Sequence, residues 1–300
     1  MPPRSRLSRR EMIAGTGFAL GSGFALAVRP ISAATIITTG ADGLDAGDIQ
    51  IPTATGPIPG YRAVPTKRKG KGKPPIVLVV HEIFGVHEHI RDVCRRVGKL
   101  GMLAVAPDLF VRQGDVSKIA DFKEISSKVV SKVPDAQVMS DLDATVAWAT
   151  AAGGGDAARV AITGFCWGGR ITWLYAAHSA ASAGSAGSVG LKAGVAWYGR
   201  LVGDKDALHP RQPIDIAGAL KAPVLGLYGG QDQGIPVASV EEMRKGLAAG
   251  GAAGKRSEIH VYPDSGHAFF ADYRPSYRPA DAADGWGRLV AWLKANGVTP

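Results

Sequence analysis

Residues 160–170 read VAITGFCWGGR, and this short stretch is the strongest indication of the fold. A run of apolar residues typical of a buried strand leads through Gly-x-Cys-x-Gly into the start of a helix. Such a nucleophile elbow places Cys166 on a strained turn, where Gly164 and Gly168 let the strand and the helix approach closely. The positive end of the helix favours a thiolate and an oxyanion. Taken alone, the motif also fits a small buried cysteine in a tight turn.

Two later segments carry the partners that a cysteine nucleophile needs. Residues 225–232, LGLYGGQD, predict a strand that runs into a glycine turn with Asp232 at its tip. Residues 259–269, IHVYPDSGHAF, predict a strand and a loop that carries His267. Singly, the acid could be a turn residue and the histidine a loop residue. Together they follow Cys166 in the order of an α/β-hydrolase triad, so we predict Cys166 as nucleophile, Asp232 as orienting acid and His267 as base.

The loop after the first long strand, residues 81–85 (HEIFG), is the expected oxyanion loop. In an α/β-hydrolase this loop supplies one backbone N–H, here that of Ile83, and the residue after the nucleophile, here Trp167, supplies the other. Glu82 would lie close to the nucleophile. The His-Glu pair could also suggest a metal, but the helical His-x-x-x-His spacing of zinc hydrolases is missing. We therefore expect no metal and no cofactor.

The chain around these motifs alternates between strand and helix patterns, which indicates a sheet covered on both faces. We predict the α/β-hydrolase fold, with a mostly parallel, doubly wound sheet, in one domain over residues 35–300. The Gly/Ser/Ala-rich stretch 179–190 predicts a surface loop. The predicted strands are 49–53, 61–65, 76–81, 102–106, 159–164, 193–197, 224–228 and 257–262, and the predicted helices are 87–100, 115–133, 135–151, 167–178, 237–249 and 282–295.

Residues 1–34 have the three parts of a secretory signal peptide: a basic start, an apolar Gly/Ala-rich run and small residues at Ser32-Ala33-Ala34. Arg9 and Arg10 resemble the pair of a twin-arginine signal, which implies the twin-arginine export machinery as a partner and a periplasmic or secreted bacterial protein. The alternatives are an N-terminal membrane anchor or a chance arginine pair. Because the apolar run is short and rich in glycine, we expect cleavage and no stable membrane span afterwards.

The 300-residue chain carries a net charge of +9, and its 46% of hydrophobic residues is typical of a globular domain. Residues 1–34 hold five Arg and one Glu, which leaves about +5 for the rest of the chain. Much of this charge lies in residues 62–73, which could hold an anionic surface or nucleic acid. We interpret this segment as a solvated loop between strands and expect no nucleic-acid partner, because no nucleic-acid fold signature accompanies it.

The motifs together resemble the dienelactone hydrolase (carboxymethylenebutenolidase) family over about residues 48–296. The resemblance implies the Cys-Asp-His triad, and it implies that Glu82 contacts the resting thiol and takes part in its activation. It also implies a small ester or lactone as substrate. The segments that carry it are His81-Glu82-Ile83-Phe84-Gly85, His89-Ile90-Arg91-Asp92, Ala106-Pro107-Asp108-Leu109-Phe110, Gly164-Phe165-Cys166-Trp167-Gly168-Gly169, Tyr198-Gly199, Gly229-Gly230-Gln231-Asp232 and Gly266-His267-Ala268-Phe269.

The sequence departs from this family at one substrate-binding position. The best-known members carry, four residues after the catalytic histidine, an Arg that holds the substrate carboxylate, and this chain has Ala271 there. Either Arg274 or Arg278 could supply a cation from a different place. We expect the substrate pocket to contain Phe84, Tyr198 and Phe269 as well as these arginines.

The predicted reaction is hydrolysis of a carboxylic ester or lactone through a thioester on Cys166. One alternative is a non-catalytic binding protein that retains the fold, since fold does not imply function. Another is a secreted esterase or peptidase of broad specificity on the same scaffold. The presence of all three triad residues in the expected order favours an enzyme over a binding protein.

Overall fold

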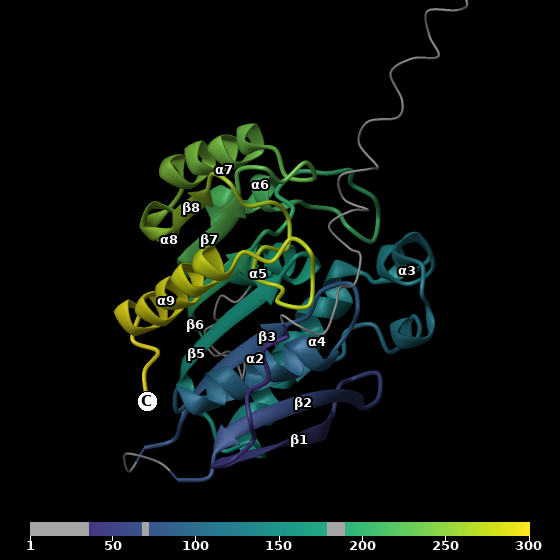
Figure 1. Cartoon of the computed structure of the whole chain (residues 1–300), viewed down its shortest axis with the longest axis vertical. Coiled ribbons are helices and arrows are strands. Elements are labelled where there is room, and N and C mark those ends of the chain that lie inside the picture. The colour runs from purple at the N-terminus through teal and green to yellow at the C-terminus, as the bar shows by residue number, and fades with distance from the viewer. Residues whose placement is uncertain (1–35, 68–71, 179–189) are drawn as a thin grey trace, which may run out of the picture.

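The computed structural model describes residues 36–67, 72–178 and 190–300, which form an eight-stranded sheet in the order β1-β2-β4-β3-β5-β6-β7-β8 (Figure 1). The six strands from β4 to β8 run parallel, and β1 and β2 add an antiparallel edge. The predicted α/β-hydrolase fold is confirmed. The strands are β1 Leu44–Ile51, β2 Ile58–Pro65, β3 Pro75–Val80, β4 Leu103–Pro107, β5 Asp156–Phe165, β6 Leu191–Trp197, β7 Val224–Gly229 and β8 Glu258–Tyr262.

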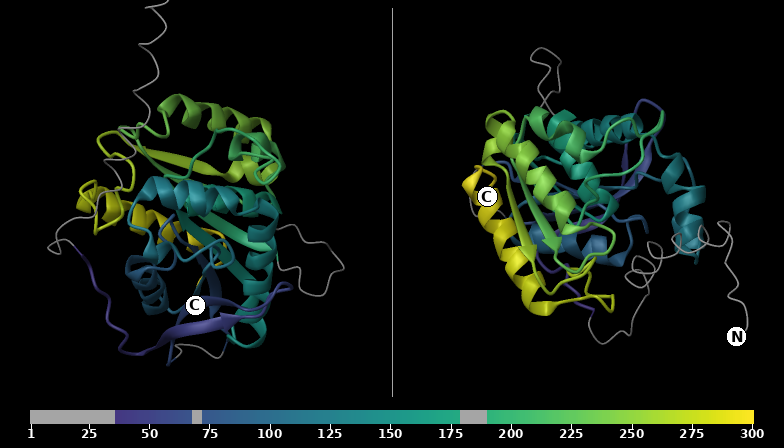
Figure 2. Two further views of the ribbon diagram at one scale, coloured as in Figure 1. Left: turned by 90° about the vertical axis from the view of Figure 1, so that its right-hand side faces the viewer. Right: turned by 90° about the horizontal axis from the view of Figure 1, so that it is seen from above.

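Helices cover both faces of the sheet (Figures 1 and 2), which explains why the central strands are apolar along their whole length. Every residue of β3, β4 and β7 is buried. Helix α2 packs on β1 to β4, α5 on β5 and β6, and α9 on β6 and β7. The α-helices are α2 Glu88–Lys99, α3 Phe122–Lys128, α4 Asp135–Ala151, α5 Trp167–His178, α6 Pro213–Ile216, α7 Val237–Ala249, α8 Ala252–Arg256 and α9 Pro279–Ala295.

The predicted helix over 115–133 is wrong. Helix α3 occupies only its middle, and two single-turn 3₁₀ segments flank it, Val116–Lys118 and Val130–Lys132. Two aspartates explain the break. The carboxylate of Asp115 accepts the backbone N–H of Ser117, and that of Asp121 accepts the N–H groups of Lys123 and Glu124. Each aspartate has an extended backbone and caps a new segment, so the chain restarts its helix instead of continuing it.

The predicted signal segment 1–34 and nearly all of the predicted loop 179–190 lie outside the described residues. Within the described part of the chain, no helix is long and apolar enough to cross a membrane. In the parallel part of the sheet, the strands β3, β5, β7 and β8 end next to the predicted site residues. The carboxyl edge of an open parallel sheet is where such folds collect their sites.

Candidate active site

Cys166 lies in the turn between β5 and α5 with a φ of 54°, in the left-handed region that non-glycine residues rarely adopt. Two glycines make this turn possible. A Cβ atom on Gly164 would lie 2.1 Å from the carbonyl oxygen of Gly168, and one on Gly168 would lie 2.4 Å from that of Val80. The Cys166 N–H donates to the carbonyl of Trp197 at 3.0 Å, which ties the turn to β6. The elbow predicted from the sequence is therefore present, with its sulfur partly exposed.

Asp232 and His267 meet because the loops after β7 and β8 are joined by backbone hydrogen bonds. The N–H of Gly230 donates to the carbonyl of Tyr262 at 2.7 Å, and that of Gln231 to the carbonyl of Ser265 at 2.8 Å. His267 Nδ1 then donates to Asp232 Oδ2 at 2.7 Å. Asp232 is only 4% exposed, so this hydrogen bond is shielded from water. The acid thereby fixes the orientation and the tautomer of the imidazole.

His267 also interacts with Cys166, so the three residues predicted as a triad lie together. Burial lowers the pKa of His267, but the charge of Cys166, then the charge and hydrogen bond of Asp232 and a hydrogen bond with Cys166, raise it to about 10. An imidazole with this pKa holds its proton at neutral pH. The site therefore places a positively charged imidazole beside the sulfur of Cys166, which is the setting that a cysteine nucleophile needs.

The loop after β3 is fixed by His81, a residue to which we had assigned no role of its own. His81 is fully buried, and its Nε2 accepts the backbone N–H of Leu109 at 3.1 Å. Because Nε2 is an acceptor, the ring proton lies on Nδ1, which donates to the carbonyl of Glu82 at 2.6 Å. Burial also lowers the pKa of His81, which keeps the ring neutral. The imidazole thus joins the Glu82-Ile83 segment to the loop after β4.

Glu82 is buried beside the nucleophile, as predicted, but its hydrogen bonds go elsewhere. Its Oε2 accepts from the hydroxyl of Tyr273 at 2.6 Å and from His87 Nε2 at 3.0 Å. Burial raises the pKa of Glu82, and the His87 hydrogen bond with the charge of Arg274 outweighs this and lowers it far below its usual range. Within the described residues, no hydrogen bond joins Glu82 to Cys166. Glu82 is therefore an ionised carboxylate whose charge is balanced by neighbours other than the thiol.

The sequence offered two arginines, Arg274 and Arg278, as the cation of the substrate pocket. The structure places Arg274 there. A small pocket beside Cys166 is lined by Glu82, Ile83, Phe84, Cys166, His267, Ala268 and Arg274. The guanidinium lies over the Phe84 and Tyr273 rings, 4.7 and 4.9 Å from their centroids. Ala271 is fully buried, whereas Arg278 is exposed at the start of α9 and is not among the lining residues.

The segment after the catalytic histidine is anchored to α2 by Asp272. Arg96 Nη2 donates to Asp272 Oδ2 at 2.7 Å, and His89 Nδ1 lies 3.2 Å from Asp272 Oδ1. Asp272 is 1% exposed, so these ion-pair contacts are buried. They hold the next two residues, Tyr273 and Arg274, against Glu82. The pocket wall is therefore fixed by residues from a helix that is distant in sequence.

Comparison with known proteins shows the family to which a chain with this geometry belongs. The model of the "Dienelactone hydrolase family" matches residues 58–297. A Methylorubrum extorquens protein named "Putative carboxymethylenebutenolidase" is 59% identical over 295 residues, covering 98% of this chain and 95% of that protein. The chain belongs to the dienelactone hydrolase family.

Two further relatives of this chain agree. An Escherichia coli K12 protein with the same name as the first is 54% identical over 276 residues, covering 92% of this chain and 96% of that protein. The crystal structure of a "Putative Dienelactone Hydrolase" from Klebsiella pneumoniae has 52% identity and a TM-score of 0.77, covering 84% of this chain and 98% of that one. The family and the hydrolase class predicted from the motifs are confirmed.

Tyr198 and Phe269, which were also predicted to belong to the pocket, are not among the residues that line it. Tyr198 packs against His267, and Phe269 packs against Tyr198. Tyr198 is fully buried and meets His267 edge to face, with ring centroids 5.2 Å apart, and Phe269 lies 5.4 Å from Tyr198. The ring of Trp167 stacks on that of His81, with centroids 5.5 Å apart.

The sequence did not indicate the roles of Tyr273 and His81, or the hydrogen bond between His87 and Glu82. His81 lies in the predicted oxyanion loop and Tyr273 precedes Arg274, but no rule of sequence spacing connects either residue to Glu82.

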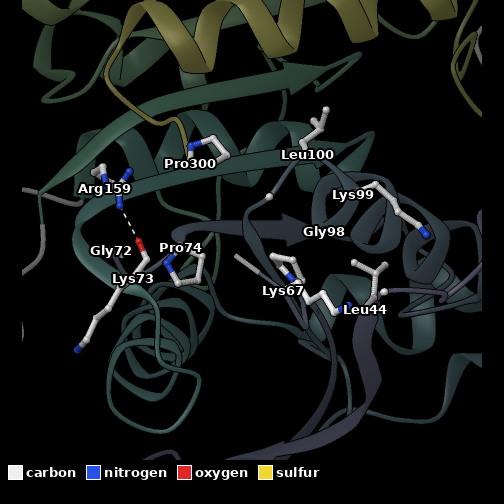
Figure 3. Close-up of a pocket in the computed structure, with 13 residues that line it drawn as sticks. Leu44, Lys67, Gly72, Lys73, Pro74, Gly98, Lys99, Leu100, Arg159 and Pro300 are labelled. Atoms are coloured by element: carbon white, nitrogen blue, oxygen red, sulfur yellow. Dashed lines mark hydrogen bonds between the residues drawn. The ribbon is translucent and has the colours of Figure 1, made fainter. Parts of the chain in front are cut away.

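A larger hollow of roughly 540 Å³ lies at the opposite edge of the sheet, at the amino ends of the parallel strands (Figure 3). It is lined by Lys67, Lys73, Lys99 and Arg159, among others. Arg159 donates to Asp156 and to the carbonyls of Lys73 and Thr299, and Lys99 donates to the carbonyl of Asp42. Arg159 and Lys99 therefore already make contacts that stabilise the fold. The residues that can perform chemistry lie at the other edge, so size alone does not identify the active site.

Proposed function

We propose that this dienelactone hydrolase homologue cleaves a small carboxylic ester or lactone through a thioester on Cys166. The observation that carries the proposal is the contact of His267 with both Asp232 and Cys166, which raises the pKa of the imidazole to about 10. This arrangement supports a preformed thiolate without any cofactor. The small pocket beside the sulfur supports a small molecule rather than a folded protein as substrate.

In the proposed first step, the Cys166 thiolate attacks the carbonyl carbon and forms a carbon–sulfur bond. The carbonyl electron pair moves to the oxygen, where the backbone N–H groups of Ile83 and Trp167 stabilise the oxyanion. The oxyanion collapses, the carbon–oxygen bond of the ester breaks, and the leaving alkoxide takes the proton of His267. In a lactone, the alcohol stays attached to the acyl group.

In the second step, His267 removes a proton from water, and the hydroxide attacks the thioester carbonyl. Collapse of the second oxyanion breaks the carbon–sulfur bond and releases the carboxylic acid. The thiolate and the protonated imidazole are thereby restored. Asp232 accepts the Nδ1 hydrogen bond throughout and holds the ring in position.

For Glu82 we propose a part in thiol activation that depends on its neighbours. A carboxylate beside a thiolate opposes ionisation of the thiol by repulsion between like charges. Tyr273, His87 and Arg274 balance the charge of Glu82 in the resting protein. A substrate that carries its own carboxylate would compete for Arg274 and would change this balance when it binds. Phe84 and Arg274 line the proposed substrate pocket, and the exposure of Arg278 makes it the weaker candidate. Tyr198 packs behind the pocket against His267, and Phe269 packs against Tyr198.

A hydrolysis screen tests the proposal. Purified protein and its Cys166→Ala variant are assayed with lactones, aryl esters and short peptides, and the acyl-enzyme is trapped by acid and weighed by mass spectrometry. We expect turnover of at least one ester or lactone, a mass increase on Cys166 equal to the acyl group, and neither result with Cys166→Ala. Turnover that survives this substitution would show that another group is the nucleophile.

We also propose that residues 1–34 are a twin-arginine signal and that residues 35–300 are exported to the periplasm or beyond. The arginine pair, the apolar run and the small residues at 32–34 support this. Changing both Arg9 and Arg10 to Lys should keep the precursor in the cytoplasm, as measured by fractionation and immunoblotting. Processing of this variant at the normal rate would contradict the proposal.

A further inference from the structure

The hydroxyl of Tyr198 is a polar group that the fold itself does not use. Tyr198 directly follows β6 and is fully buried, yet no partner for its hydroxyl occurs among the described residues. Most buried polar side chains do find a partner. The ring packs on His267, Phe269 and Phe165, and a phenylalanine would make the same contacts. The oxygen atom therefore needs an explanation other than packing.

The backbone holds this side chain in a strained position. Tyr198 has a φ of 38°, which is unfavourable for a bulky residue. Its N–H donates to the carbonyl of Leu227 at 2.8 Å, and a Cβ atom on the adjacent Gly199 would lie only 2.3 Å from the carbonyl carbon of Gly169. The close contact of the two loops thus fixes the turn. Strain that the surrounding structure maintains is common at functional sites.

The hydroxyl is close enough to the pocket residues to respond to their charges. Burial raises the pKa of Tyr198 well above its ordinary value, the charges of Glu82, Tyr273 and Cys166 add to this, and the charge of Arg274 opposes it. Glu82, Cys166 and Arg274 all line the small pocket beside the nucleophile. The hydroxyl therefore stays protonated, so it can donate a hydrogen bond below that pocket.

We propose that Tyr198 is a specificity-determining residue whose hydroxyl donates a hydrogen bond to a second oxygen on the acyl chain of the substrate. The inference rests on the proposed ester hydrolysis and adds the substrate class: acyl groups that carry an oxygen close to the scissile carbonyl. A site that hydrogen-bonds an oxygen rejects the carbon analogue, because the buried donor is then left without a partner.

Tyr228 offers a matched control for the hydroxyl. It is also a buried tyrosine at a strand end, but its hydroxyl accepts a hydrogen bond from Trp173 Nε1 at 2.9 Å. Tyr228→Phe should lower the melting temperature by about 2–4 °C, because it leaves the indole N–H without a partner. Tyr198→Phe should leave the melting temperature unchanged or raise it. Equal losses in the two variants would show that the fold uses the Tyr198 hydroxyl, and would overturn the inference.

Paired 4-nitrophenyl esters test the substrate class. Each pair matches an oxygenated acyl group with a carbon analogue: methoxyacetate with butyrate, 3-methoxypropionate with valerate, and hemisuccinate with 4-methylpentanoate. Intrinsic reactivity cancels when the kcat/KM ratio within a pair is compared between wild type and variant. We expect Tyr198→Phe to lower the oxygen preference in at least one pair by roughly 3- to 10-fold, and Tyr228→Phe to leave all three ratios unchanged.

The outcomes separate this inference from the function on which it rests. If wild type cleaves the esters through Cys166 but Tyr198→Phe keeps every ratio, the hydrolase proposal stands and the role of Tyr198 is wrong. If wild type cleaves neither these esters nor any lactone, the proposed function fails, and the substrate class inferred from Tyr198 fails with it. A lowered ratio at an unchanged melting temperature supports both.

Discussion

Cys94 and Cys166 are chemically identical side chains in two very different regions of the molecule. Cys94 lies inside α2 and is fully buried against the sheet, where burial raises the pKa of its thiol far above the usual range. Cys166 lies on a strained turn, partly exposed, beside the buried pair His267 and Asp232. Both are free thiols. We therefore expect the backbone conformation and the neighbouring imidazole, not the residue type, to make Cys166 the more reactive of the two thiols.

The two regions also differ in how charge is arranged around the sulfur. Near Cys94, the charges of Arg95 and Arg91 lower the pKa of the thiol, but burial is the larger effect. Near Cys166, two carboxylates are present, Asp232 and Glu82, and each has a partner of its own in His267 or Tyr273. Both carboxylates near Cys166 are therefore already hydrogen-bonded to groups other than the thiol. Four predictions test this difference between the surroundings of Cys94 and Cys166.

The largest effect should come from Asp232, which distinguishes the surroundings of Cys166 from those of Cys94. Asp232→Asn keeps the shape of the side chain but removes the charge and favours the wrong tautomer of His267, so kcat should fall roughly 10³–10⁴-fold. The control is Asp264→Asn, since Asp264 is exposed in the same loop as His267. Steady-state kinetics with the best ester measures both variants. Equal activity of the two would remove Asp232 from the triad.

The next largest effect is the difference in alkylation rate between the two thiols. Brief treatment with iodoacetamide at pH 7, followed by peptide mass spectrometry, should label Cys166 at least about 10³-fold faster than Cys94. A fully buried thiol in a helix reacts only when the structure opens, and such openings in a stable core are rare. Preferential labelling of Cys94, or a disulfide between the two, would contradict the assignment of the nucleophile.

The sequence predicted the elbow, the triad and the sheet because each depends on local patterns and on chain order. Gly164 and Gly168 mark the turn in the sequence itself, and Asp232 and His267 follow apolar runs at strand ends. The partners of Glu82 could not be predicted, since Tyr273 is 191 positions away and its loop has no periodicity. For the same reason Arg274 and Arg278 could not be separated from the sequence.

The helix predicted over 115–133 failed for a different reason. Its apolar spacing was real, but Asp115 and Asp121 cap new segments, and short side-chain hydrogen bonds of this kind compete with helix continuation. The structure thus adds contacts between distant residues and corrects element boundaries. The candidate reacting groups themselves were proposed from the sequence, and the structure brings them together.

The third prediction sharpens the contrast at Glu82, a buried carboxylate that lines the small pocket beside Cys166. If Glu82 takes part in thiol activation, Glu82→Gln should lower kcat by about 10- to 10³-fold with little change in melting temperature. If Glu82 only supports the loop, the variant should lose about 1 kcal/mol of stability or less and keep its kcat. Tyr273→Phe is a useful companion, because it removes one donor and leaves the carboxylate in place. Wild-type kcat in Glu82→Gln would leave a plain Cys-His-Asp hydrolase.

The smallest expected effect concerns stability and the proton on His267. Its pKa is about 10 in the folded protein, against an ordinary value of 6.5. Because the folded value is raised, the protonated ring contributes stability that is fully present below pH 6.5 and is lost as the pH rises through 10. Asp232→Asn removes one of the two groups that raise this pKa. The free-energy difference of unfolding between wild type and Asp232→Asn should therefore shrink as the pH rises from 6.5 to 10, by about 1–3 kcal/mol.

Urea denaturation at several pH values measures this difference directly. Lysines, tyrosines and Cys94 titrate in both proteins, so their contributions largely cancel in the comparison. A difference that stays constant with pH would mean that His267 is neutral in the resting protein. Cys166 would then hold its own proton until substrate arrives, and its faster alkylation relative to Cys94 would reflect access to the sulfur rather than a preformed thiolate. The pH dependence therefore separates the two ways in which the same turn can make a cysteine reactive.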